Sequence, residues 1–216
     1  MMGFFSFVQD RWSLLSFQGY QHVSMVLQSL LLATLIALVI AILTYSSPLA
    51  SRLAESTTAL GLTLPSFALF GLLIAFIPSG VTLTIVALTF YGTLPILRNA
   101  IVGFRGVDRG LVESARGMGM NRLTTLLRLQ LPLAWPVIFT GIRVSAQMLM
   151  GIGAIAALAS GPGLGSFIFS GLSRLGGANA TNSAVAGVLG VVLLAIVLDV
   201  VPNVVGRLTT SRGIRV

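Results

Sequence analysis

Ionisable side chains are scarce in this chain, and their types limit the chemistry that it can perform. Its 216 residues include five acidic side chains, one histidine and thirteen basic side chains, all of which are arginine. The absence of cysteine removes thiolate nucleophiles and thiolate metal ligands, and the single His22 cannot build a histidine-rich metal site. A Walker A loop needs a lysine against the nucleotide phosphates, so this chain is not itself a P-loop ATPase. We therefore expect no catalytic residue and no bound metal.

Polar side chains gather in the segment 98–135, where six arginines, Asp108 and Glu113 follow one another between long apolar stretches. Asp108 is a suitable N-cap for one short helix, and a second helix can start at Asn121 and end at Pro132. The Gly-Met-Gly sequence between them permits a turn. The segment therefore predicts two short amphipathic helices hinged at glycine. Such an element either lies on anionic lipid headgroups through its arginines or docks a soluble partner, and the residue chemistry favours neither alternative.

The second of these helices is expected to present a single apolar face. Its leucines recur near helical spacing, and its polar residues fall between them. The leucines that mark this face are Leu123, Leu126, Leu127 and Leu131.

The remainder of the chain is too apolar for a soluble protein. Only 8% of its residues are charged and 56% are hydrophobic, whereas soluble domains carry roughly 25% charged residues. A helix that spans a membrane needs about 20 apolar residues. Five stretches qualify, which predicts an all-α integral membrane protein with five transmembrane helices. Their approximate bounds are 23–44, 57–77, 80–97, 136–158 and 184–206.

Arginines segregate to one side of these five predicted spans. The loop 45–56, the segment 98–135 and the tail 207–216 hold ten arginines, whereas the opposite side holds Arg11 and Arg174. Cytoplasmic loops carry an excess of basic residues, so the pattern predicts an external N-terminus and a cytoplasmic C-terminus. This bias accounts for the net charge of +8 without any nucleic-acid partner.

The predicted organisation has three parts. Residues 1–22 are aromatic-rich and interrupted by charge, which favours an interfacial segment at the lipid headgroups. Residues 23–206 form one transmembrane domain, and its outer loop 159–183 contains a short helix. Residues 207–216 form a cytoplasmic tail.

Two charged residues are expected within the membrane, Arg143 and Asp199. An ionisable group at that depth is a functional-site hypothesis by default, but these two also suit a structural ion pair with each other or with loop arginines. Pro65 and Pro95 interrupt the second and third spans. Proline frees backbone carbonyls, which are tolerated where protein or a watery cavity receives them, so both residues are candidate path elements as well as candidate packing kinks.

The polar segment resembles the EAA loop of bacterial ABC importer permeases. That pattern reads E-A-A, three residues, G, nine residues and I-x-L-P, and its spacing is intact here. The residues at its fixed positions are Glu113, Ser114, Ala115, Gly119, Leu129, Leu131 and Pro132. Only Ser114 for alanine and Leu129 for isoleucine depart from it, and both changes are chemically mild.

Residues 57–206 resemble, more specifically, the permease subunits of importers for glycine betaine, carnitine or choline. The resemblance implies the type I ABC importer permease fold in a bacterial inner membrane. It implies that the EAA loop docks onto a cytosolic ATPase that binds ATP and Mg²⁺, with coupling roles for Glu113, Ser114, Ala115, Gly119, Leu131 and Pro132. The implied partners are two such ATPase subunits, a second permease copy or paralogue, and an extracytoplasmic solute-binding protein.

A quaternary ammonium substrate gives the aromatic residues of the second and third spans a candidate role. Phe67, Phe70, Phe90 and Tyr91 offer ring faces for cation–π attraction, although aromatic residues in membrane helices also serve simple packing. The alternatives to import of a quaternary ammonium solute are import of another small polar solute such as an amino acid, ion-gradient-driven transport, intramembrane catalysis and membrane anchoring of cytosolic proteins. The scarcity of intramembrane carboxylates disfavours the ion-gradient mechanism.

Overall fold

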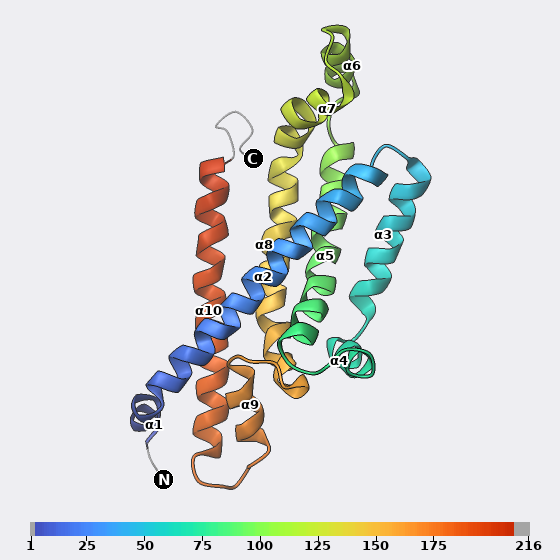
Figure 1. Cartoon of the computed structure of the whole chain (residues 1–216). Helices are drawn as coiled ribbons and strands as arrows, with labels where there is room; N and C mark the ends of the chain where they lie inside the picture. The colour runs from blue at the N-terminus through green and yellow to red at the C-terminus, as the bar shows by residue number, and fades with distance from the viewer. Residues whose placement is uncertain (1–2, 210–216) are drawn as a thin grey trace.

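The computed structural model describes residues 3–209, and side chains up to Val200. All regular secondary structure in this part of the chain is helical (Figure 1). Residues 210–216, most of the predicted tail, lie outside the described residues. The helices are α1 (Phe4–Asp10), α2 (Trp12–Thr44), α3 (Pro48–Thr63), α4 (Ser66–Ile74), α5 (Val81–Arg105), α6 (Arg109–Gly117), α7 (Arg122–Thr125), a π-helical segment (Leu126–Gln130), α8 (Leu131–Ile155), a 3₁₀ turn (Ala156–Ala159), α9 (Gly165–Leu172) and α10 (Ala180–Thr209).

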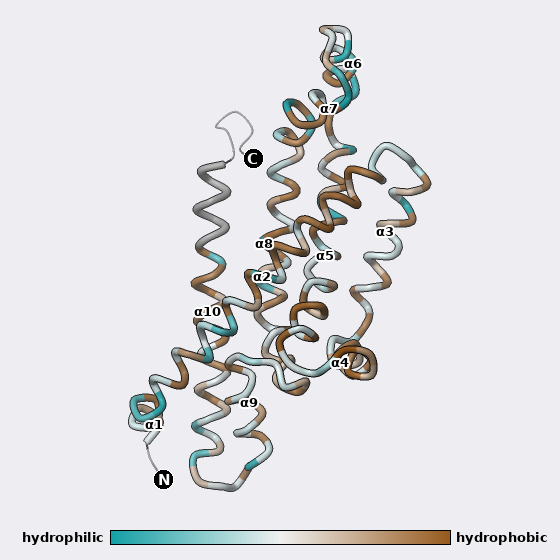
Figure 2. The backbone as a smooth tube through the Cα atoms, in the orientation of Figure 1, coloured by the Kyte–Doolittle hydropathy of each residue, from teal (hydrophilic) through white to brown (hydrophobic). Residues whose placement is uncertain are grey.

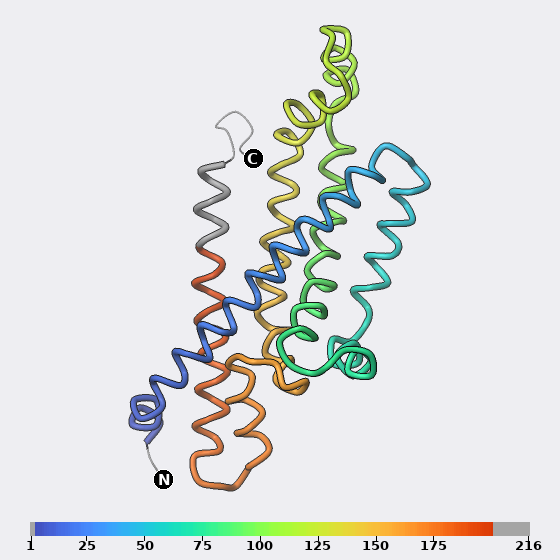
Figure 3. The backbone as a smooth tube through the Cα atoms, in the orientation of Figure 1, coloured from blue at the N-terminus to red at the C-terminus, as the bar shows by residue number. Residues whose placement is uncertain are grey.

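Five helices, α2, α3, α5, α8 and α10, run between the two ends of the molecule (Figures 1 and 3). Four helical stretches of the described chain are long and apolar enough to cross a membrane, and α3 with α4 forms a bent fifth candidate. The α2–α3 turn, α6, α7 and the end of α10 lie together at what we call the α6 end. Helices α1, α4 and α9 lie at the opposite, α9 end (Figure 1). The α2–α3 turn and the α6–α7 region, which were predicted to lie on one side of the membrane, therefore lie at the same end of the molecule (Figure 1).

The predicted bounds of the second span, 57–77, are wrong. Helix α3 already begins at Pro48, where a loop was expected, because Ser47 caps it and proline suits a first helical turn. It ends at Thr63, and α4 then turns away by 91°. The break lies at Leu64 and Pro65, both in extended conformation, because a residue before proline avoids the helical region. Pro65 thus breaks the span into a crossing helix and a transverse one.

Helix α2 is much longer than the first predicted span. It runs unbroken from Trp12 to Thr44, so half of the predicted interfacial segment 1–22 belongs to the same helix as the span. Its 33 residues extend about 50 Å, compared with about 30 Å of hydrocarbon. Such a helix fits only with a tilt, and α2 crosses the other helices obliquely (Figure 1).

Helix α5 lies at the centre of the bundle, against α2, α3 and α8. Glycines allow its backbone to approach α8 closely: a Cβ added to Gly141 would lie 2.8 Å from Asn99 Cβ and 3.0 Å from the Pro95 oxygen. Small residues at helix contacts are the usual basis of packing in membranes, where van der Waals contact replaces the hydrophobic effect. The α5–α8 pair is consequently closely fitted.

Pro95 does not interrupt the third span, contrary to the sequence prediction. It lies inside α5, which continues to Arg105. Side-chain donors supply hydrogen bonds around it: Ser145 Oγ donates to the Gly92 oxygen at 2.8 Å, and Asn99 Nδ2 to the Pro95 oxygen at 2.9 Å. Proline removes the hydrogen bond to the carbonyl four residues earlier, here that of Tyr91, and these two side-chain bonds strengthen the neighbouring part of the helix at Gly92 and Pro95.

Candidate functional site

The two short helices and the glycine turn predicted from the polar segment are present at the α6 end. The carboxylate of Asp108 caps α6 by accepting from the Gly110 nitrogen at 2.6 Å, and the amide oxygen of Asn121 caps α7 by accepting from the Thr124 nitrogen at 2.8 Å. Between them Gly119 has φ +87°, a conformation that favours glycine. The turn is closed by the Met120 N–H, which donates to the Ala115 oxygen at 3.1 Å.

The first triplet of the EAA pattern divides between surface and core. Ala115 is 3% exposed, whereas Glu113 and Ser114 face outward on a helix whose surface is hydrophilic (Figure 2). Within the described chain the carboxylate of Glu113 forms no ion pair, and it borders a cavity of about 270 Å³. The other polar side chains around this cavity are Tyr45, Ser46, Arg105, Arg109, Arg116 and Gln130. Glu113 is therefore available to a partner.

Pro132 does not end the second short helix, which corrects the sequence prediction. Helix α7, the π-helical segment and α8 are continuous from Arg122 through the membrane. In the π turn the Leu131 N–H donates to the Leu126 oxygen, five residues back. This wider turn directly precedes Pro132, whose ring would clash with the carbonyl four residues earlier in a regular α-helix. The second short helix and the membrane helix thus form one continuous helical rod.

The predicted single leucine face is also divided by the π turn. Leu126 and Leu131, five residues apart, pack against the core. Leu123 and Leu127 are 63% and 51% exposed. An apolar surface of this kind at a helix that protrudes from the bundle suits contact with a partner protein.

Contacts between residues that are distant in sequence join the segment 98–135 to the end of α2 and to α3. The Tyr45 hydroxyl, just beyond α2, donates to Oε1 of the buried Gln130 at 3.0 Å, and its ring lies 5.2 Å from that of Phe104. Arg105 donates to the Ser51 hydroxyl at 3.2 Å, which joins α5 to α3. No local pattern marks these residues, because each partner is more than 50 positions away in the chain.

Arg143 and Asp199 form the ion pair that was one of the alternatives from sequence. Nε and Nη2 of Arg143 donate to Oδ1 and Oδ2 of Asp199 at 2.8 and 2.9 Å. Gln147, which sequence reasoning missed, also donates to Oδ1 of Asp199. The pair joins α8 to α10, and both side chains remain partly exposed.

The candidate path residues are not brought together around one cavity. Tyr91 donates its hydroxyl to the Leu64 oxygen at 2.8 Å and so satisfies the backbone next to Pro65. Phe70 is 2% exposed and packs in the core, whereas Phe67 is 64% exposed. Phe90 stacks edge-to-face on Tyr91, with ring centroids 5.4 Å apart. A role for these aromatic residues and for Pro95 in solute passage stays a prediction.

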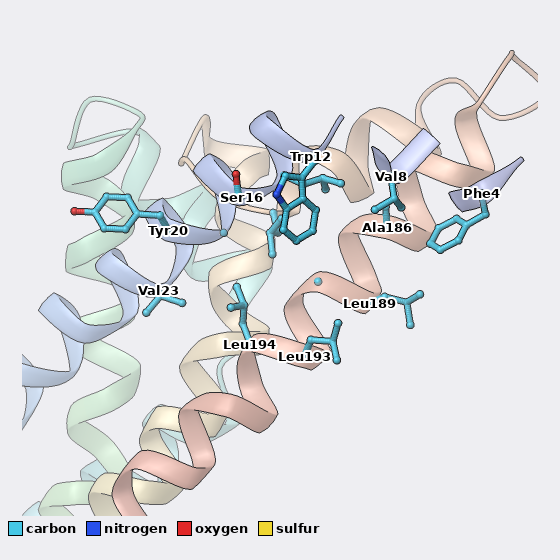
Figure 4. A pocket seen from close by; sticks show the side chains of 14 residues that line it. Phe4, Val8, Trp12, Ser16, Tyr20, Val23, Ala186, Leu189, Leu193 and Leu194 are labelled. Carbon is cyan, nitrogen blue, oxygen red and sulfur yellow. The ribbon is translucent and has the colours of Figure 1, made fainter. Parts of the chain in front are cut away.

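A large apolar cavity lies between α1–α2 and α10 (Figure 4). It measures about 530 Å³ and no charged side chain lines it. Nearby, His22 is fully buried, and its Nε2 lies 3.1 Å from the Met150 oxygen. His22 therefore packs between helices.

Comparison with known proteins identifies the fold and the family. A family model described as "Binding-protein-dependent transport system inner membrane component" matches residues 29–210. The choline transport system permease protein OpuBB of Bacillus subtilis (strain 168) is 35% identical over 214 residues, which cover 97% of this chain and 94% of that protein. The carnitine transport permease protein OpuCB of Listeria monocytogenes is 32% identical over 210 residues, with the same coverage.

Solved structures show the same architecture. An inward-facing MetNI methionine ABC transporter matches with a TM-score of 0.81 at 20% identity, over 94% of this chain and 99% of that one. An amino acid ABC transporter with histidines matches with a TM-score of 0.75 at 18% identity, over 96% and 99%. The chain thus has the type I ABC importer permease fold. It belongs to the binding-protein-dependent transport system inner membrane components and is a membrane permease subunit of an ABC importer.

Proposed function

We propose that the chain forms the membrane path of an importer for a small quaternary ammonium solute, such as choline, carnitine or glycine betaine. The relatives that support this are named for choline and carnitine transport and match nearly the whole chain. A glycine betaine/carnitine/choline permease of Bacillus subtilis (strain 168) is 39% identical over 71% of the chain. The complex contains a second permease, identical or paralogous, and an extracytoplasmic solute-binding protein that delivers the solute.

The α6–α7 element is the proposed docking site for the cytosolic ATPase, which binds ATP and Mg²⁺. One observation carries this assignment: Glu113 is exposed and unpaired in the described chain, while Ala115, two residues on, anchors the same helix in the fold. Gly119 turns the chain toward α7, and Leu131 and Pro132 join the element to α8. ATP-driven movement of the ATPase subunits would displace this element and thereby α8.

The α6 end faces the cytoplasm in this proposal, and the N-terminus faces outward. The α6 end contains the start of α3, the end of α5, α6 and α7, which include Arg52, Arg105, Arg109, Arg116 and Arg122, whereas the described elements at the α9 end include Arg11, next to α1, and Arg174, just after α9 (Figure 1). Basic residues concentrate on the cytoplasmic side of membrane proteins. The same orientation brings the α6–α7 element to the compartment that contains ATP.

The decisive experiment reconstitutes the complex with its native partners and measures solute-stimulated ATP hydrolysis. We expect Gly119→Pro and Glu113→Arg to abolish stimulation while the permease still inserts and assembles. Gly176→Pro is the matched control, because Gly176 has the same φ of +87° and equally open surroundings but lies at the α9 end.

Two results would contradict the proposal separately. Full stimulation in both α6–α7 variants would refute the coupling role. A wild-type complex that responds to none of the three solutes would refute the substrate class.

A further inference from the structure

The Arg143–Asp199 ion pair joins two helices that are long and apolar enough to cross a membrane, α8 and α10. Arg143 is the central residue of α8, with twelve residues on either side, so it lies about 18 Å from both helix ends. Its fork-like bond to Asp199 fixes the geometry, yet 42% of the Arg143 side chain and 26% of the Asp199 side chain are exposed. The pair is therefore accessible to something outside this chain.

Polar side chains lie on the exposed face of α8 around this pair, next to the exposed Val144. Thr140 and Gln147 lie on it, one turn before and one turn after Arg143, and both are exposed. Charged residues inside membrane segments almost always face other protein or a water-filled cavity instead of lipid. We call the face formed by Thr140, Arg143, Gln147 and Asp199 the α8 polar face. It contrasts with the opposite side of α10, where Val197 is 62% exposed.

We propose that the α8 polar face lines the solute path and binds a zwitterionic solute at the Arg143–Asp199 pair. The Arg143 guanidinium takes the solute carboxylate, for which its planar fork is suited. The Asp199 carboxylate faces the quaternary ammonium, while Gln147 keeps a hydrogen bond to Asp199. When the ion pair opens, the solute carboxylate replaces Asp199 as the partner of Arg143, and the quaternary ammonium replaces Arg143 as the partner of Asp199. This assignment rests on the proposed function and adds the groups that recognise the solute within the membrane.

Glycine betaine and choline separate this role from a structural one. Both carry a trimethylammonium group, but only glycine betaine carries a carboxylate. At solute concentrations well below saturation, Arg143→Gln should reduce the rate of glycine betaine transport per assembled complex about tenfold more than the rate of choline transport, as expected for one lost charge-assisted hydrogen bond. Asp199→Asn should slow both solutes alike, and Arg143→Lys should restore part of the glycine betaine rate.

An equal loss for both solutes in Arg143→Gln would overturn the proposal, since a purely structural pair predicts that result. The wild-type complex is the reference for the proposed function itself. If it transports neither solute, the substrate class fails; if it transports both and the ratio is unchanged in the variant, only the binding site fails.

Cysteine labelling tests the site with Arg143 and Asp199 both in place. The chain has no cysteine, so Thr140→Cys, Gln147→Cys and the control Val197→Cys each introduce a unique thiol. A membrane-impermeant thiol reagent, applied to the assembled complex in open membrane fragments, should label positions 140 and 147 and leave 197 unlabelled. Saturating glycine betaine should slow labelling at 147. Absence of labelling at both 140 and 147 would overturn the proposal, whichever solutes the complex carries.

Discussion

Gly141 makes the closest contact between α8 and α5, and replacing it with alanine tests the packing argument. Its added Cβ would lie 2.8 Å from Asn99 Cβ, 3.0 Å from Ile96 Cα and 3.0 Å from the Pro95 oxygen. Two of these three neighbours are backbone atoms, so no side-chain rotation relieves the overlap. The helices must separate, and the donation from Ser145 to the Gly92 oxygen lengthens with them.

The expected cost follows from two opposing terms. Overpacking a well-fitted contact costs about 1–3 kcal/mol, and alanine recovers up to about 1 kcal/mol because it favours helix more than glycine does. The Gly141→Ala variant should therefore be less stable by roughly 1–2 kcal/mol. For a chain of this size such a loss lowers the midpoint of thermal denaturation by about 2–8 °C.

The assay is thermal denaturation of the purified permease in one detergent, with Gly151→Ala as the matched control. Gly151 lies on the same helix, is exposed, and has no atom within 4 Å of an added Cβ. Only the helix-propensity gain applies there, so its midpoint should stay unchanged or rise. Equal midpoints for the two variants would refute the argument that α5 and α8 are held at the distance set by glycine.

Two further predictions use the same denaturation assay. Gly163→Ala should destabilise the permease by about 1–3 kcal/mol more than Gly176→Ala. Both glycines have positive φ, but of the two only Gly163 has a neighbour that the added Cβ would meet, Nδ1 of His22 at 2.8 Å. Equal losses of stability in the two variants would exclude that contact as the cause. Tyr45→Phe should cost about 1–2 kcal/mol by leaving the buried Gln130 oxygen without its donor, and in a double-mutant cycle Gln130→Leu should remove most of the added cost; additive effects would show that the hydrogen bond contributes nothing.

Local features of the polar segment were predictable from sequence because their causes lie within a few residues. Asp108 and Asn121 cap helices through their own neighbouring N–H groups, and Gly119 adopts a positive φ that other residues disfavour. The number of membrane crossings follows from lengths of apolar sequence in the same way. Sequence reasoning also placed Arg143 and Asp199 at membrane depth and included their pairing among its alternatives.

Features that depend on distant partners were not predictable. Pro95 and Pro132 are both helix breakers by local rules, yet each lies within a continuous helical stretch because side chains of α8 or a π turn accommodate it. Gln147 carries no local signal, since its importance arises only where α10 brings Asp199 beside it. The aromatic residues Phe67 and Phe70 differ in burial because α4 turns at Pro65, and the direction of that turn is a tertiary property.

The unbroken rod from Arg122 to the far side of the membrane has a mechanical consequence. A flexible linker would absorb a displacement applied at α7, whereas the helical backbone is continuous from Arg122 to Arg143. The Tyr45–Gln130 hydrogen bond holds this stretch against the end of α2, and the π turn and Pro136 are local departures from a regular α-helix between Arg122 and Arg143. A displacement of α7 would therefore reach Arg143 as a rotation or translation of the continuous helix.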